Sequence, residues 1–183
     1  MYSKSLTCLK NVVGYVLLMC LCVGPAAAQL LKYDNDGELM GAAAISPTAG
    51  GQIISRLVDK CGAYSDSLRA DGDQVLRSWE ERHRAYLEEN RRVRTQLEAM
   101  YSANPDTRKT FQYALEKQYP ALVDKQYETY AAAIDVMQTQ PEKVQMCNSY
   151  YRAISEKRFD LKVNDPTLSA FLDKRIQARS GTK

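Results

Sequence analysis

An uninterrupted helical repeat between Asp73 and Tyr101 constrains this chain more than any other feature of its sequence. Residues spaced alternately three and four apart form one face of it, and Gly and Pro are absent. Those residues are Leu76, Trp79, His83, Tyr86, Asn90, Val93, Leu97 and Met100. The spacing is typical of a helix whose a and d positions face a partner helix. A helix of roughly 43 Å needs packing along such a face, so the repeat predicts a helical bundle.

Pro-containing boundaries divide the rest of the chain into further helices. Ser46–Pro47 and Asn104–Pro105 each combine a capping side chain with Pro at the first helical position, and Gln140–Pro141 and Asp165–Pro166 mark later starts. Because the connection after Tyr101 is short, we expect the next helix to return antiparallel to the long one, kinked or broken at Pro120.

The predicted fold class is all-α. No strand-like alternation or hairpin turn occurs after the first 28 residues. We therefore expect an antiparallel helical bundle built on a long helical hairpin, with shorter flanking helices and one disulfide.

Residues 1–28 have the features of a secretory signal peptide. Two Lys residues precede an apolar stretch over residues 12–23, and a run of three Ala ending at Ala28 offers a cleavage site. The stretch is short for a membrane span. A lipoprotein anchor at Cys20 or Cys22 and an uncleaved anchor helix are the alternatives. We expect cleavage after Ala28, a periplasmic or secreted location, and no stable membrane insertion afterwards.

The leader also determines how the net charge is interpreted. It contains two Lys and no acidic residue, so its removal lowers the formal net charge from +3 to +1. Such a balance gives no indication of nucleic-acid binding. After the leader we expect a flexible, Gly-rich tether over residues 29–46, a single helical-bundle domain over residues 47–179, and a frayed tail over residues 180–183.

Cys61 and Cys147 are the two cysteines outside the leader. In an exported protein two cysteines indicate one disulfide, with two buried free thiols as the alternative. The two positions are 86 residues apart. Closing so long a loop stabilises a fold by about 4–5 kcal/mol in the chain-entropy model.

Enzyme chemistry finds little support in the sequence. His83 is the only His of the chain, which excludes a His-rich metal site within one subunit and c-type haem attachment. Known nucleophile, metalloprotease and phosphate-binding motifs do not occur. Neighbouring carboxylates such as Glu80–Glu81 and Glu88–Glu89 diverge on a helix, which is typical of a solvated face. We expect no catalytic residue, no metal site and no cofactor.

Four residues of the long helix are the candidate binding residues. His83 and Asn90 are polar at positions where an apolar side chain packs better, and Trp79 and Tyr86 flank them. Against the returning helix, satisfied polar side chains would fix the register of the bundle. On an open face, Trp79 and Tyr86 would instead anchor a partner protein beside the polar pair.

These observations lead to one main hypothesis about function. We expect an exported, non-catalytic helical protein that binds another envelope or secreted protein, as an inhibitor, immunity or adaptor protein does. The alternatives are a periplasmic small-molecule or lipid carrier, with its ligand near Pro120, and a stress chaperone. Self-association into a homo-oligomer is compatible with each of them.

Overall fold

The computed structural model describes residues 32–181, and within this range the chain is helical without any strand. In chain order the elements are α1 (Asp36–Ala43), α2 (Ser46–Gly62), α3 (Asp66–Ser102), α4 (Pro105–Tyr113), the π-helical segment η1 (Ala114–Gln118), α5 (Tyr119–Asp135), α6 (Gln140–Ser155), α7 (Leu161–Asn164) and α8 (Pro166–Ser180). The predicted all-α class is thus confirmed for these residues. The expected signal peptide and its cleavage point lie outside them. In the described part, no helix combines the length and apolarity needed to cross a bilayer.

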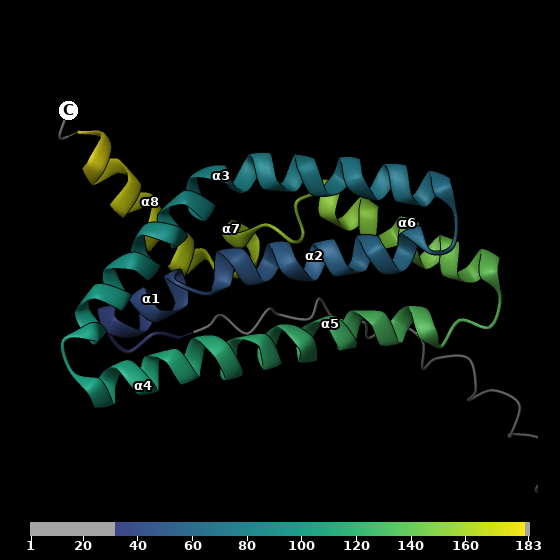
Figure 1. Ribbon diagram of the computed structural model, residues 1–183. Helices are drawn as coiled ribbons and strands as arrows, with labels where there is room; N and C mark the ends of the chain where they lie inside the picture. The colour runs from purple at the N-terminus through teal and green to yellow at the C-terminus, as the bar shows by residue number, and fades with distance from the viewer. Residues whose placement is uncertain (1–31, 182–183) are drawn as a thin grey trace, which may run out of the picture.

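The helices that follow α3 run back along the opposite side of α2 (Figure 1). α3 and the arm made of α4, η1 and α5 run in opposite directions, and α2 lies between them (Figure 1). α2 makes the most extensive helix contact of the described chain with α3, and it also packs on α5. The buried face of α3 is therefore covered mainly by the preceding helix rather than by the returning one.

Two apolar clusters make up the core. The first is formed by α2, the first half of α3, α5 and α6, and it contains the cysteine pair. The second is formed by α1, the second half of α3, α7 and α8. Figure 1 shows α3 curving at the end that carries α1 and α8, so the two halves of α3 serve different clusters.

Part of the expected flexible tether is a helix. The Asn35 side chain caps α1 by accepting from the Glu38 N–H, and Ala43 and Ala44 at the end of α1 are buried in the second cluster. Small residues here allow α1 to approach α3 closely, which composition alone does not reveal. The prediction of a flexible tether is wrong for residues 36–46. At the other end, α8 extends to Ser180, where the frayed tail was predicted to begin.

A π-helical turn lies next to Pro120, where a kink or a break was expected. Pro has no N–H, and its ring crowds the carbonyl four residues earlier in an α-helix. In η1 the Tyr119 N–H donates to the Ala114 carbonyl, five residues back. This wider turn accommodates the Pro ring, and the arm continues from α4 into α5.

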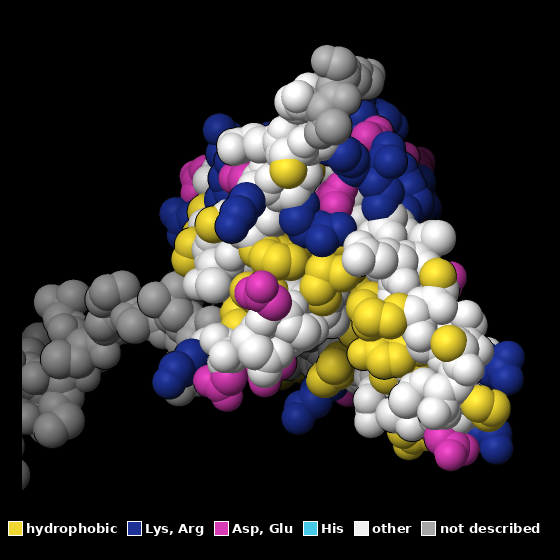
Figure 2. Space-filling model, turned by 90° about the vertical axis from the view of Figure 1, so that its left-hand side faces the viewer, with side chains coloured by type: hydrophobic (Ala, Val, Ile, Leu, Met, Phe, Trp, Pro, Cys, Tyr) yellow, Lys and Arg dark blue, Asp and Glu magenta, His cyan; other side chains and the backbone are white. Residues whose placement is uncertain are grey.

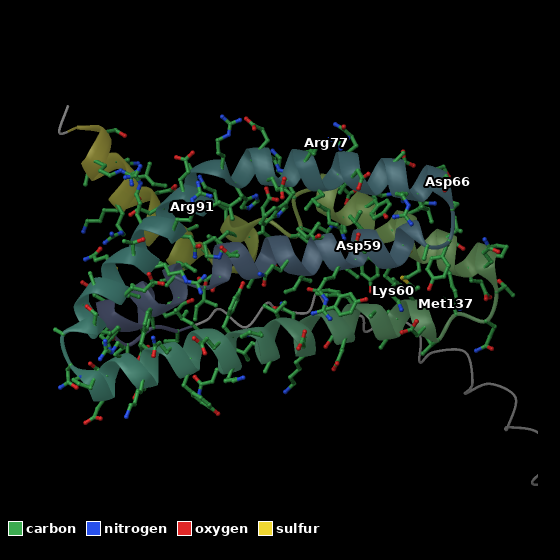
Figure 3. The ribbon with its side chains drawn as sticks, viewed as in Figure 1. Asp59, Lys60, Asp66, Arg77, Arg91 and Met137 are labelled. Atoms are coloured by element: carbon green, nitrogen blue, oxygen red, sulfur yellow. A yellow bond between two sulfur atoms is a disulfide. The ribbon has the colours of Figure 1, made fainter. Side chains whose placement is uncertain are left out.

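The sulfur atoms of Cys61 and Cys147 lie 2.06 Å apart, at disulfide distance. They join the end of α2 to α6, and both side chains are fully buried. Next to them Lys60 pairs with Asp135 at 2.6 Å, and Figure 3 shows Lys60 between α2 and α5. The same end of α2 is thus tied to two helices.

Candidate functional site

The four candidate binding residues of α3 are all buried. Trp79, His83, Tyr86 and Asn90 have exposed fractions between 2% and 6%. They offer no surface to another protein, because helices of this chain already cover them. The hypothesis of an open, partner-binding face along residues 76–100 is therefore wrong at these four positions.

His83 joins α3 to the segment that follows α6. Its Nδ1 lies 2.9 Å from the Trp79 carbonyl, and the Leu161 N–H donates to its Nε2 at 3.2 Å. A neutral imidazole with its proton on Nδ1 satisfies both bonds. Burial lowers the pKa of His83, and the Asp160 carboxylate, 4.0 Å from Nε2, opposes that shift only in part.

The neighbours of His83 bind the same segment. The Trp79 Nε1–H donates to the Phe159 carbonyl at 3.2 Å, and its ring stacks on His83 with centroids 4.1 Å apart. The Arg82 guanidinium donates to both Asp160 carboxylate oxygens at 3.1 and 3.3 Å. One turn of α3 therefore holds residues 156–161, which we call the α6–α7 loop, through side chains and backbone alike.

Asn90 and Tyr86 make equivalent links to other elements. The Asn90 Nδ2 donates to the Ala43 carbonyl, and its Oδ1 accepts from the Thr48 hydroxyl, each at 2.7 Å. The Tyr86 hydroxyl donates to Asp173 of α8 at 2.8 Å. The polar positions are satisfied, but by α1, α2, α8 and the α6–α7 loop instead of the returning helix.

Glu89 is a buried ionic residue that sequence reasoning placed on a solvated face. Its carboxylate accepts from the Arg175 Nε at 2.9 Å and also pairs with Arg179. The two Arg residues are four apart on α8 and so lie on one face of it. That spacing was a signal for the pairing, although it could not identify the acidic partner.

A pocket of about 360 Å³ lies beside this network, between α2, α3, α5 and residues 159–165. We call it the aromatic pocket, because rings of Trp79, Tyr130 and Phe159 line it. Tyr130 and Phe159 contact one another with centroids 5.3 Å apart. The α5 residues that line the pocket are Gln126 and Tyr130, so Gln126 is the lining residue of α5 nearest to Pro120 in sequence. This pocket is therefore not the ligand site expected near the Pro120 kink, which stays a prediction.

A second feature is the end of the hairpin, residues 91–118, which we call the hairpin tip. α4 and η1 within it contain no buried residue. Met100 and Tyr113 are 57% and 59% exposed, and Tyr101 stacks on Phe111 in a half-buried pair. Figure 2 faces this end of the molecule and shows hydrophobic side chains in a hollow, with Lys and Arg gathered above it.

The charge of the hairpin tip is positive. Residues 91–118 carry six Lys or Arg against three Asp or Glu. Arg94 pairs with Glu98, while Figure 3 shows Arg91 where α3 curves. The hairpin tip thus combines a net positive charge with exposed apolar side chains.

No protein-family model matches the chain, and comparisons with curated proteins and with solved structures find no match either. Within the described residues, no group of three or more His, Cys, Asp or Glu side chains is placed to hold a metal ion.

Proposed function

We propose that this is an exported, non-catalytic protein that binds another envelope or secreted protein at its hairpin tip. One observation carries the proposal: α4 and η1 together contain no buried residue, yet exposed and half-buried apolar side chains accompany them. A contiguous apolar surface bordered by polar residues is characteristic of protein-binding sites. The proposed partner-binding surface is thus at the far end of α3 and no longer on its buried middle.

The chemistry of the tip favours an amphipathic helix with acidic residues as its occupant. The hollow between helices suits the apolar stripe of such a helix. The net positive charge of the tip complements carboxylates beside that stripe, which adds specificity and speeds association. Inhibitor, immunity and adaptor proteins all require a contact of this kind.

Site-specific cross-linking tests this proposal. A photoreactive residue is placed at Tyr113 in the tip or at Val163 in α7; their exposed fractions, 59% and 56%, are matched. We expect one exported protein to be cross-linked from position 113 and none from position 163. The cross-linked segment should be an acidic amphipathic helix. Equal capture from both positions, or a captured segment of other chemistry, would contradict the proposal.

Substitutions then test the charge and the apolar contact separately. Arg108→Glu with Lys109→Glu, and Tyr113→Ser, should each weaken binding of the captured helix by about ten-fold or more. Val163→Ser should leave it unchanged, and higher salt should weaken only the wild-type interaction strongly. Capture of many unrelated proteins would support the chaperone alternative. Light scattering that shows an oligomer lost on Tyr113→Ser would make a second copy the occupant.

A further inference from the structure

We propose that the aromatic pocket binds a small neutral or cationic molecule with an apolar ring body. This site lies apart from the hairpin tip, and the inference does not depend on the proposed protein partner. It rests on three observations: the residues that line the pocket, the hydrogen bonds that the polar lining groups already make, and the charge of the lining.

The buried polar groups of the lining are already engaged within the protein. The Trp79 Nε1–H donates to the Phe159 carbonyl, and the two ring nitrogens of His83 are bonded to the Trp79 carbonyl and the Leu161 N–H. The Asp165 carboxylate accepts from the Leu168 N–H at 2.9 Å and from the Tyr33 hydroxyl at 2.5 Å. The interior of the pocket therefore presents aromatic and aliphatic surface, which favours a ligand with an apolar body.

Small residues of α2 line the pocket beside Trp79. They are Ala49 and Gly50, and the missing side chain of Gly50 lets the Trp79 ring pack closely on α2. A Cβ atom at Gly50 would lie 3.3 Å from the Trp79 Cζ2, which is a tight contact. The volume of about 360 Å³ is near the lower end of the range for ligand pockets, so a body of one or two rings fits.

The charge of the lining disfavours an anion. No Lys or Arg lines the pocket in the described part of the chain, and its one carboxylate, Asp165, is only 4% exposed. Aromatic faces also attract cations. At the exposed side, Ser46 and Gln126 can accept or donate hydrogen bonds to a polar end of the ligand.

Trp79 provides a direct measurement because it is the only Trp of the chain. Three matched probes share one ring: 2-phenylethanol is neutral, phenethylamine is cationic and phenylacetate is anionic. With excitation selective for Trp, we expect a saturable emission change for the first two, with a Kd of about 1 mM or below. Phenylacetate should bind at least about ten-fold more weakly.

Paired variants locate the binding. Gln126→Lys places an ammonium at the mouth of the pocket, whereas Gln145→Lys makes the same charge change on α6, and both Gln residues are exposed. Only Gln126→Lys should improve phenylacetate binding and weaken phenethylamine binding. Ala49→Leu should fill the space and abolish binding of all three probes, with the helical circular dichroism unchanged.

Other results would overturn the inference. These are an absence of saturable emission change with any probe, equal affinity for the cation and the anion, or identical effects of the two Lys variants. If Ala49→Leu lost its helical signal, the Gln126→Lys and Gln145→Lys pair would still decide. Tyr113→Ser in the hairpin tip should bind the probes as the wild type does, so that failure here and failure of the proposed function are distinguished.

Discussion

At the scale of single residues, His83 explains why a polar side chain occupies the buried face of α3. The imidazole has a donor and an acceptor on different edges, so it bridges the Trp79 carbonyl and the Leu161 N–H at once. A Leu at this position would leave the Leu161 N–H buried without its partner. Removing one partner of a buried pair costs about 1–3 kcal/mol. His83 is thus a link between elements that are distant in sequence.

The same burial predicts a pH dependence of stability. Because the pKa of His83 is lowered in the folded state, the unfolded chain takes up the proton first as the pH falls. The free energy of unfolding should therefore be fully retained above the ordinary His value of about 6.5 and should decrease below it, by up to about 1.4 kcal/mol per pH unit. Urea unfolding between pH 7.5 and pH 5.5 measures this slope.

His83→Gln is the control for that slope, since no other His is present. The variant should be less stable than the wild type at pH 7.5, and its stability should change little over the same pH interval. A wild-type stability that rises on acidification would contradict the assignment of a neutral, buried imidazole.

At the scale of elements, the contact of α3 with its neighbours depends on Gly72. A Cβ atom there would lie 2.5 Å from the Tyr151 Oη and 2.8 Å from the Val58 Cγ1. The missing side chain allows α3, α2 and α6 to meet in the first cluster. In an exposed helix Gly→Ala stabilises by about 1 kcal/mol, but overpacking a core costs about 1–3 kcal/mol.

Gly72→Ala should therefore destabilise the protein by about 1–3 kcal/mol despite its better helix propensity. Gly41→Ala is the matched control, because a Cβ atom at Gly41 of α1 meets nothing within 4 Å. That variant should be as stable as the wild type or slightly more so. Thermal unfolding of the two variants, followed by circular dichroism, measures both; a Gly72→Ala protein with an unchanged Tm would show that Tyr151 and Val58 move aside without cost.

The sequence predicted which face of α3 is buried better than it predicted what covers it. The residues of the repeat from Trp79 to Leu97 are buried, whereas Met100 at the end of the repeat is 57% exposed. Periodicity identifies an apolar face but contains no information about the helix that packs on it, so the role of α2 was missed. α1 was missed because its short run of Gly and Ala lacks an amphipathic pattern. After α6, Lys157 has a φ of 66° where Gly is usual, so no residue pattern indicated the loop that His83 binds.

At the scale of the whole molecule, the two core clusters are stabilised by different kinds of interaction. The second cluster is tied together by hydrogen bonds and ion pairs of Asn90 and Glu89. The first contains Cys61 and Cys147, whose sulfur atoms lie at disulfide distance across 86 residues of chain. α3 passes through both clusters, so loosening the first also weakens the support of the aromatic pocket, which lies beside it.

Loss of the Cys61–Cys147 bond should therefore lower the stability of the entire fold. Removing a native disulfide typically costs about 2–5 kcal/mol, chiefly because the bond restricts the unfolded chain. The double variant Cys61→Ala with Cys147→Ala should show this loss in urea unfolding. Reduction of the wild type should reproduce most of it, which separates the cross-link from the change in side-chain volume. Two alkylatable thiols at these positions in the unreduced protein, or equal stability with and without reductant, would show that the pair is not bonded and that packing alone holds α2 to α6.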